Sequence, residues 1–144
     1  MRRDGRKVEE KLTRKRKKEI QTLIYRYSGP RLNVGYIFAP LRFRDTDEPK
    51  LEEMIFIYAD DFDILLSALK SKYPLIDSET EETYEAFDPC WDNPISEPVW
   101  REILTEMDAW PTKELELRAF IDSFTTWARV QLEQAEGIVV TGNL

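Results

Sequence analysis

The 144-residue chain contains no histidine and one cysteine. Histidine titrates closest to neutral pH and is the residue that most often acts as a general base or binds zinc. Its absence excludes Ser-His-Asp and Cys-His nucleophile systems. With only one cysteine, an internal disulfide and a zinc site of nitrogen and sulfur ligands are excluded as well. Any bound metal would have to be held by carboxylates.

Long hydrophobic runs and glycine-rich loops are also missing. No apolar stretch approaches the roughly 20 residues that span a bilayer, and the basic N-terminus is not followed by an apolar segment. We therefore expect no membrane association and a cytoplasmic location. The five glycines are scattered, so no phosphate-binding loop is predicted. A pair of carboxylates can hydrolyse glycosides without histidine, but no motif positions such a pair. We expect no catalytic residues, no cofactor and no enzyme activity.

Charge is divided unevenly along the chain. The whole sequence has 21 Lys and Arg against 28 Asp and Glu, a net of −7, whereas residues 1–18 hold 10 basic and 3 acidic side chains, a net of +7. Residues 19–144 therefore carry −14. We expect 1–18 to be a basic flexible tail, either a solvated leader or an arm that binds phosphate backbones. The length and the 42% hydrophobic content predict a single acidic domain over 19–144.

The first half of the predicted domain is rich in β-branched and aromatic residues. Such residues favour strands, and they occur over 20–27, 33–43 and 51–59. A Ser28-Gly29-Pro30 turn separates the first two runs, so we expect these two strands to form an antiparallel hairpin. The third run is apolar throughout 54–58, which is typical of a buried central strand.

Three helices are predicted from apolar residues at helical spacing. The first is expected to begin with Asp60 or Asp61 as N-cap, and the second with Ser96 as N-cap. Thr112 can cap the third, which extends over about six turns to Gly137 as C-cap. Several aromatic residues on the last two helices are more typical of core packing than of a cofactor site: Trp100, Trp110, Phe120, Phe124 and Trp127.

The remaining segments complete the expected fold. Residues 78–87 are interpreted as an exposed edge strand, 88–94 as a loop, and 138–141 as a strand that returns to the sheet. The order β-β-β-α-β-α-α-β predicts a single-domain α+β fold, with a mainly antiparallel sheet and about three helices packed on one face.

Two clusters of acidic residues are candidate binding sites. Asp60, Asp61 and Asp63 could bind a hard cation, but acidic side chains also gather at helix N-termini because the helix dipole favours them there. A calcium loop would in addition need a central glycine and a distal glutamate at fixed spacing, so no metal site is predicted.

The second cluster lies in residues 79–97, which we call the acidic segment. Its seven acids cannot be buried without heavy desolvation costs, so they form a negative surface, either a solubilising face or a site for a basic partner. Aromatic residues among the acids favour the second interpretation, because interface hot spots have this composition. The acids on both sides of Cys90 predict an inert thiol. The predicted partner-binding residues are Glu79, Glu81, Glu82, Tyr84, Glu85, Asp88, Trp91 and Asp92.

Two stretches resemble bacterial immunity proteins of polymorphic-toxin and contact-dependent growth inhibition systems. They are FDPCWDNPI at 87–95, followed by a Trp-bearing helix, and AEGIVVTGNL at 135–144. In that family a long C-terminal helix leads into a final strand of the form IVVxGN. The resemblance implies a small cytoplasmic α+β protein that binds and neutralises one cognate toxin domain, often a nuclease, and has no catalytic residues. The alternative is a nucleic-acid-associated regulator that uses the basic arm.

Overall fold

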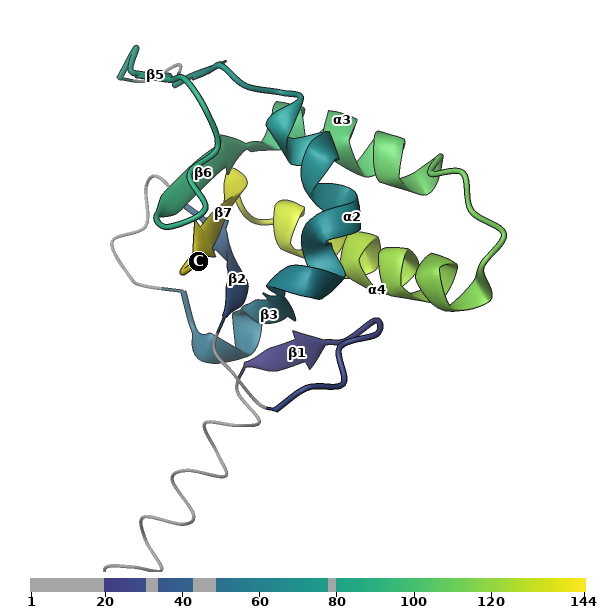
Figure 1. The fold of residues 1–144 in the computed structure, drawn as a ribbon. Helices are drawn as coiled ribbons and strands as arrows, with labels where there is room; N and C mark the ends of the chain where they lie inside the picture. The colour runs from purple at the N-terminus through teal and green to yellow at the C-terminus, as the bar shows by residue number, and fades with distance from the viewer. Residues whose placement is uncertain (1–19, 31–33, 43–48, 78–79) are drawn as a thin grey trace, which may run out of the picture.

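The structure is a computed structural model and describes residues 20–30, 34–42, 49–77 and 80–144 (Figure 1). The predicted tail at 1–18 and the predicted contact residue Glu79 lie outside these ranges. The described part contains a five-stranded sheet, a small two-stranded sheet and three α-helices, which confirms the α+β prediction.

The larger sheet is mixed and mostly antiparallel. Its strands follow one another across the sheet in the order β1-β3-β2-β7-β6, and β1 beside β3 is the parallel pair. The strands are β1 (Gln21–Leu23), β2 (Gly35–Leu41), β3 (Ile55–Tyr58), β6 (Asp92–Ser96) and β7 (Gly137–Gly142). β3 has a neighbour on each side, and β7 returns between β2 and β6, so both of these predictions are confirmed.

The predicted hairpin between 20–27 and 33–43 is wrong. β1 runs parallel to β3, with Gln21 opposite Ile55, whereas β2 pairs with the other side of β3. The physical reason lies after β1, where the backbone N–H groups of Tyr25, Arg26 and Tyr27 all donate to the Asp61 carboxylate. These bonds hold the chain against the start of α2 (Ala59–Lys70) instead of letting it fold back on β1.

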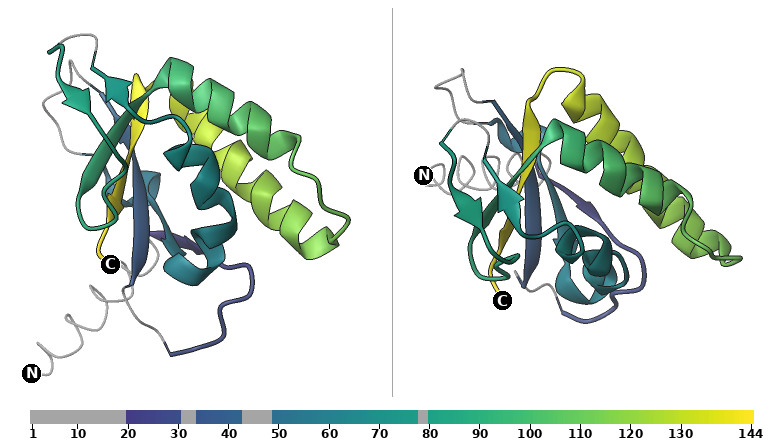
Figure 2. Two further views of the ribbon diagram at one scale, coloured as in Figure 1. Left: turned by 45° about the horizontal axis from the view of Figure 1, so that its top comes forward. Right: turned by 90° about the horizontal axis from the view of Figure 1, so that it is seen from above.

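Three helices cover one face of this sheet (Figure 2). They are α2, α3 (Glu97–Asp108) and α4 (Leu115–Leu132); a short 3₁₀ helix, η1 (Leu51–Glu53), precedes β3. The core lies between helices and sheet, where the Phe38 ring packs edge-on against Phe62 and Phe124 at centroid distances of 5.0 and 5.1 Å. No helix in the described ranges is both long and apolar enough to cross a bilayer.

The aromatic residues predicted for the core pack there. Trp100, Phe120 and Phe124 are buried, and Trp110 and Trp127 are partly buried against the same cluster. The Trp100 indole Nε1 donates a hydrogen bond of 2.9 Å to the carbonyl oxygen of Ile138, which ties α3 to β7.

Helix ends follow the predictions only in part. Ser96 is the N-cap of α3, as predicted, without a side-chain capping bond. Asp60 and Asp61 lie inside the first turn of α2, after Tyr58 as N-cap, and Thr112 precedes Glu114, the N-cap of α4. α4 ends at Leu132, so the predicted C-cap, Gly137, instead begins β7. A Cβ there would lie 2.2 Å from the Ile95 carbonyl oxygen, so the glycine is required by the close approach of β6.

The middle of the chain differs most from expectation. Residues 78–79 lie outside the described ranges; of residues 80–87, only Thr83–Tyr84 form a strand, β5, and it pairs with β4 (Leu75–Ile76) in a separate sheet. Residues 88–94 are not wholly a loop, because β6 begins at Asp92. Pro94 suggested a loop, but β6 is the edge strand of the large sheet, where proline is tolerated.

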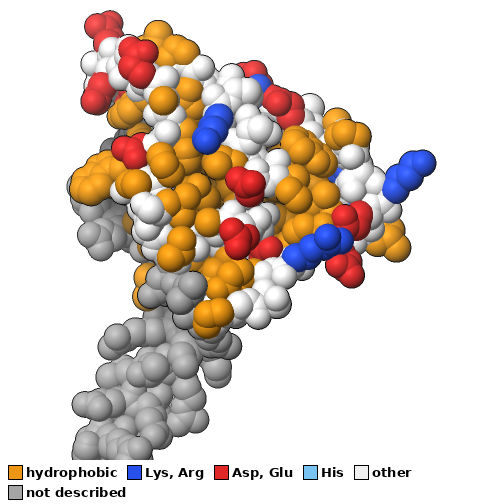
Figure 3. Space-filling view, in the orientation of Figure 1, with side chains coloured by type: hydrophobic (Ala, Val, Ile, Leu, Met, Phe, Trp, Pro, Cys, Tyr) orange, Lys and Arg blue, Asp and Glu red, His pale blue; other side chains and the backbone are white. Residues whose placement is uncertain are grey.

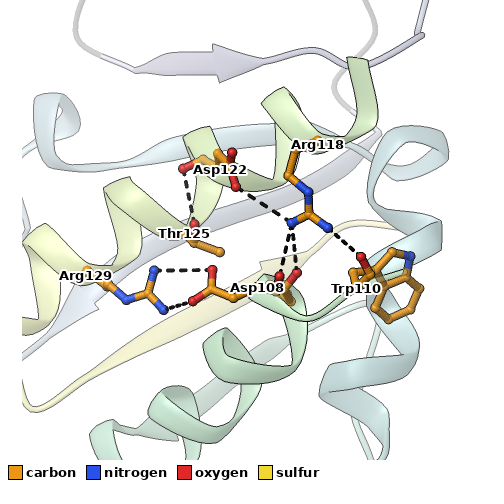
Figure 4. Close-up of polar contacts among 7 residues, drawn as sticks. Asp108, Trp110, Arg118, Asp122, Thr125 and Arg129 are labelled. Carbon is orange, nitrogen blue, oxygen red and sulfur yellow. Dashed lines mark hydrogen bonds and ion pairs between the residues drawn. The ribbon is translucent and has the colours of Figure 1, made fainter. Parts of the chain in front are cut away.

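A polar network joins α3 to α4 (Figure 4). The Arg118 guanidinium donates to the carbonyl oxygens of Met107, Asp108 and Trp110, at 3.4, 3.4 and 2.5 Å. These carbonyls lie at and just after the end of α3, where helical hydrogen bonds run out; the Met107 oxygen also accepts the Trp110 N–H at 3.1 Å. Arg129 forms an exposed ion pair of 2.5 Å with the Asp108 carboxylate. Arg118 therefore acts as a C-terminal cap supplied by the neighbouring helix.

Candidate functional site

The two stretches that carry the family resemblance lie side by side. β6 and β7 pair in antiparallel register, with Asp92 opposite Thr141 and Asn93 opposite Val140. Residues about 50 positions apart in the sequence thus form one ladder at the edge of the sheet. The loop of residues 88–91 precedes β6 and lies against the C-terminal residues 142–144, to which it is hydrogen bonded.

Asn93 fixes the backbone of the 88–91 loop. Its side chain is 4% exposed; its Oδ1 accepts the Asp88 N–H at 2.7 Å, and its Nδ2 donates to the carbonyl oxygens of Asp88 and Trp91 at 2.7 and 3.1 Å. Nδ2 also lies 3.1 Å from the Val140 carbonyl oxygen. A buried amide with every polar atom bonded holds its partners in one arrangement. The shape of the loop is therefore set by β6 and β7.

The C-terminal residues secure the same loop from its other side. A Cβ on Gly142 would lie 2.2 Å from the Pro89 carbonyl oxygen, so only glycine allows the two backbones to approach this closely. The Leu144 N–H donates to Pro89 at 3.2 Å, and the exposed Cys90 thiol donates to the Leu144 carbonyl oxygen at 2.8 Å. The glycine and asparagine residues of the two stretches thus have structural roles.

Trp91 projects from this fixed loop and is 71% exposed. Exposed carboxylates flank it at Asp88 and Asp92, and each is held by one bond: Asp88 accepts the Cys90 N–H at 2.9 Å, and Asp92 accepts the Thr141 hydroxyl at 2.7 Å. Trp91 is therefore a large, solvent-exposed aromatic side chain on a hydrogen-bonded loop, with a carboxylate on each side. These are the properties of a residue that anchors a binding partner.

The first part of the acidic segment belongs to a hairpin in which β4 pairs with β5. The Asp77 N–H donates to Glu82 and the Glu81 N–H donates to Asp77, each at 2.8 Å, and Glu81 has a left-handed φ of 61°. At the base of the hairpin the buried Phe87 ring packs on Tyr73 and Tyr36, at centroid distances of 6.2 and 5.8 Å. This anchor matters because two strands of two residues are marginally stable alone.

The hairpin carries exposed acids over a partly buried tyrosine. Glu81, Glu82 and Glu85 are exposed, and Figure 3 shows red side chains gathered at the end of the molecule where β5 lies. The Tyr84 hydroxyl faces the Glu82 carboxylate at 3.4 Å. Burial and the nearby charges of Glu82 and Asp77 raise the pKa of Tyr84 above its usual value. The hydroxyl is therefore protonated near neutral pH and donates to Glu82.

The structure thus divides the predicted contact residues into two groups. Tyr84 and Ser96, where β6 leads into α3, line the same hollow, and the hairpin acids Glu81, Glu82 and Glu85 lie within three residues of Tyr84 in the chain. Asp88, Trp91 and Asp92 lie at the other end of β6. The two groups thus lie toward opposite ends of the same edge strand. Glu97, the last acid of the segment, forms an ion pair with Arg101 at 3.0 Å.

The structure gives Asp61 a role that the sequence does not predict. Asp61, interpreted as a helix cap or a cation ligand, is 2% exposed and accepts three backbone N–H groups at 2.8 to 3.0 Å. The sequence offers one hint, a carboxylate at a position of the apolar stripe beside Phe62. In the described ranges, no group of three or more His, Cys, Asp and Glu side chains is arranged to hold a metal ion.

Comparison with protein-family models, with curated protein sequences and with solved structures finds no match for this chain.

Proposed function

We propose that this protein is an immunity protein that binds a cognate toxin domain and neutralises it without catalysis of its own. The observation that carries the proposal is Trp91, which is 71% exposed on a loop fixed by the buried Asn93 and flanked by two carboxylates. Exposing a tryptophan to water is unfavourable, and fixing its backbone lowers the entropy that binding would otherwise cost.

The charge of the surface supports a basic partner. The acids of the hairpin and those beside Trp91 border one edge strand, and the sequence from 19 onward carries a net charge of −14. A nuclease presents a positive cleft to its substrate, so a negative surface with aromatic anchors complements it and speeds association. A cytoplasmic nuclease toxin is thus the partner that this surface fits best.

The test is to mix the protein with the toxin domain encoded beside its gene and to measure toxin activity. Inhibition by the unaltered protein should weaken by about 30-fold in W91A, the effect of losing a hot spot of about 2 kcal/mol. L115A is the matched control, since Leu115 is 83% exposed on α4 away from this edge, and its inhibition should stay within about twofold. Full toxin activity at an excess of unaltered protein contradicts the proposal.

A second pair of variants examines the charges. The triple variant E81Q/E82Q/E85Q should associate about tenfold more slowly at low salt, and the difference should shrink at high ionic strength because salt screens exposed charges. E52Q/E116Q/E133Q removes three exposed acids elsewhere and changes the net charge equally. If both triple variants slow association alike, the partner senses net charge and not the hairpin.

A further inference from the structure

An apolar groove separates the β4–β5 hairpin from the large sheet. Its volume is about 410 Å³, and it is lined mainly by aliphatic and proline side chains: Leu41, Leu75, Ile76, Pro94, Pro98 and Val99. Figure 2 shows the hairpin standing on the side of the sheet opposite the helices. Ile76 is 73% exposed at this groove, although a surface position would ordinarily carry a polar residue.

The polar groups around the groove are few, and the charge among them is negative. Asp77, Tyr84 and Ser96 line the groove, and the Glu82 carboxylate lies beside the Tyr84 hydroxyl. Among the lining residues the structure describes, none is Lys or Arg. Small-molecule sites contain several polar groups that converge on the ligand and orient it, and this groove offers no such set. An apolar floor with a negative rim instead fits a protein segment with an apolar side chain between basic ones.

The edge of β6 decides how such a segment can bind. The Trp91 carbonyl oxygen accepts the N–H of Gly142 in β7, and the Glu97 N–H donates to Glu136, which directly precedes β7. In an antiparallel pair every second residue bonds to the partner strand, so the backbone of Pro94 faces away from β7, toward the open edge. Proline has no N–H, so it interrupts the donors that an added strand would need. A partner strand would lose a ladder bond at Pro94, so this edge favours binding through side chains over extension of the sheet.

We propose that this groove receives an apolar side chain of the toxin, from a segment in which lysine or arginine flanks that side chain. The inference rests on the proposed function and deepens it, by adding a second contact at the opposite end of β6 from Trp91. The apolar side chain packs on Ile76 and Val99, and the flanking cations face Asp77 and Glu82.

Short peptides test the groove without the toxin. The probes are acetyl-Lys-Lys-Leu-Lys-Lys-amide, the same peptide with serine for leucine, and the same peptide with glutamate for lysine, titrated into the full chain and followed by backbone amide NMR shifts. The leucine–lysine peptide should give saturable shifts at Ile76, Tyr84 and Val99. The serine peptide should bind at least about tenfold more weakly because it buries no aliphatic group. Equal binding of both lysine peptides, or shifts that avoid these residues, overturns the inference.

Two exposed aliphatic residues provide matched variants. I76S should weaken binding of the leucine–lysine peptide and inhibition of the toxin by at least about fivefold, whereas L115S should change neither. Both side chains are solvent-exposed, so both variants should keep the amide spectrum of the folded chain. If W91A weakens inhibition and I76S does not, the immunity function stands and the groove contact is overturned. If the unaltered protein leaves the toxin fully active, the proposed function itself fails.

Discussion

At the scale of single residues, Asp61 decides the path of the chain after β1. Its buried carboxylate accepts the N–H groups of Tyr25, Arg26 and Tyr27, which have no strand partner. Three backbone donors bound to one carboxylate compensate for its burial, and they also explain why β1 lies beside β3 and not beside β2. An acid that the sequence places in a helical turn therefore serves a segment 34 to 36 residues earlier.

We predict that D61A lowers the free energy of unfolding by about 3 kcal/mol, because three partly buried N–H groups lose the buried carboxylate that accepts them. D63N is the control: Asp63 lies two residues along the same helix and is exposed, so its loss should cost less than about 0.5 kcal/mol. Urea unfolding followed by circular dichroism measures both. Equal effects would mean that Asp61 acts only through the helix dipole.

At the scale of elements, an arginine of α4 caps the C-terminal end of α3 and so joins the two helices. Arg118 of α4 serves three carbonyl groups at the end of α3, whereas Arg129 contributes an exposed ion pair to the same end. The first kind of contact supplies donors to carbonyl groups where the helical hydrogen bonds end, and the second is screened by solvent.

R118Q should therefore lower the free energy of unfolding by about 1 to 2 kcal/mol at any salt concentration, since glutamine cannot reach all three carbonyls. R129Q should cost less than about 0.5 kcal/mol, and that cost should vanish in 0.5 M NaCl. Urea unfolding at two salt concentrations distinguishes the variants. An R118Q effect that disappears in salt would show that its pair with Asp122, at 3.8 Å, matters more than the cap.

At the scale of the whole molecule, the division of charge into +7 and −14 separates two hypotheses about partners. The acidic edge belongs to the described domain, and every core residue of the described ranges lies at or beyond Leu23. The basic residues 1–18 lie outside these ranges, and their two interpretations, a leader or an arm for nucleic acid, make different predictions.

A shortened chain of residues 19–144 should unfold at the same temperature as the full chain, within about 2 °C, because it keeps every core residue of the described ranges. Fluorescence anisotropy with a labelled DNA duplex separates the two interpretations. Binding that falls steeply with salt and is lost on shortening indicates an arm, and equal, weak signals from both chains indicate a leader. A large fall in the unfolding temperature would contradict the predicted domain boundary.

The sequence by itself determined the class of fold and most of its elements. Helical spacing placed α2, α3 and α4, and β-branched runs placed β2, β3 and β7, because these patterns are local and survive in any packing. It also determined that catalysis by histidine or a cysteine–histidine pair is unavailable, since composition does not depend on conformation.

Only the tertiary structure decided which segments are neighbours. The parallel pairing of β1, the ladder between β6 and β7 and the groove beneath the hairpin join residues far apart in sequence. Such contacts depend on buried groups, as at Asp61 and Asn93, whose partners no local pattern reveals. The acidic segment could be found from its composition. Its division into a hairpin and a tryptophan loop depends on β6, and the sequence did not predict this strand because Pro94 is typical of loops.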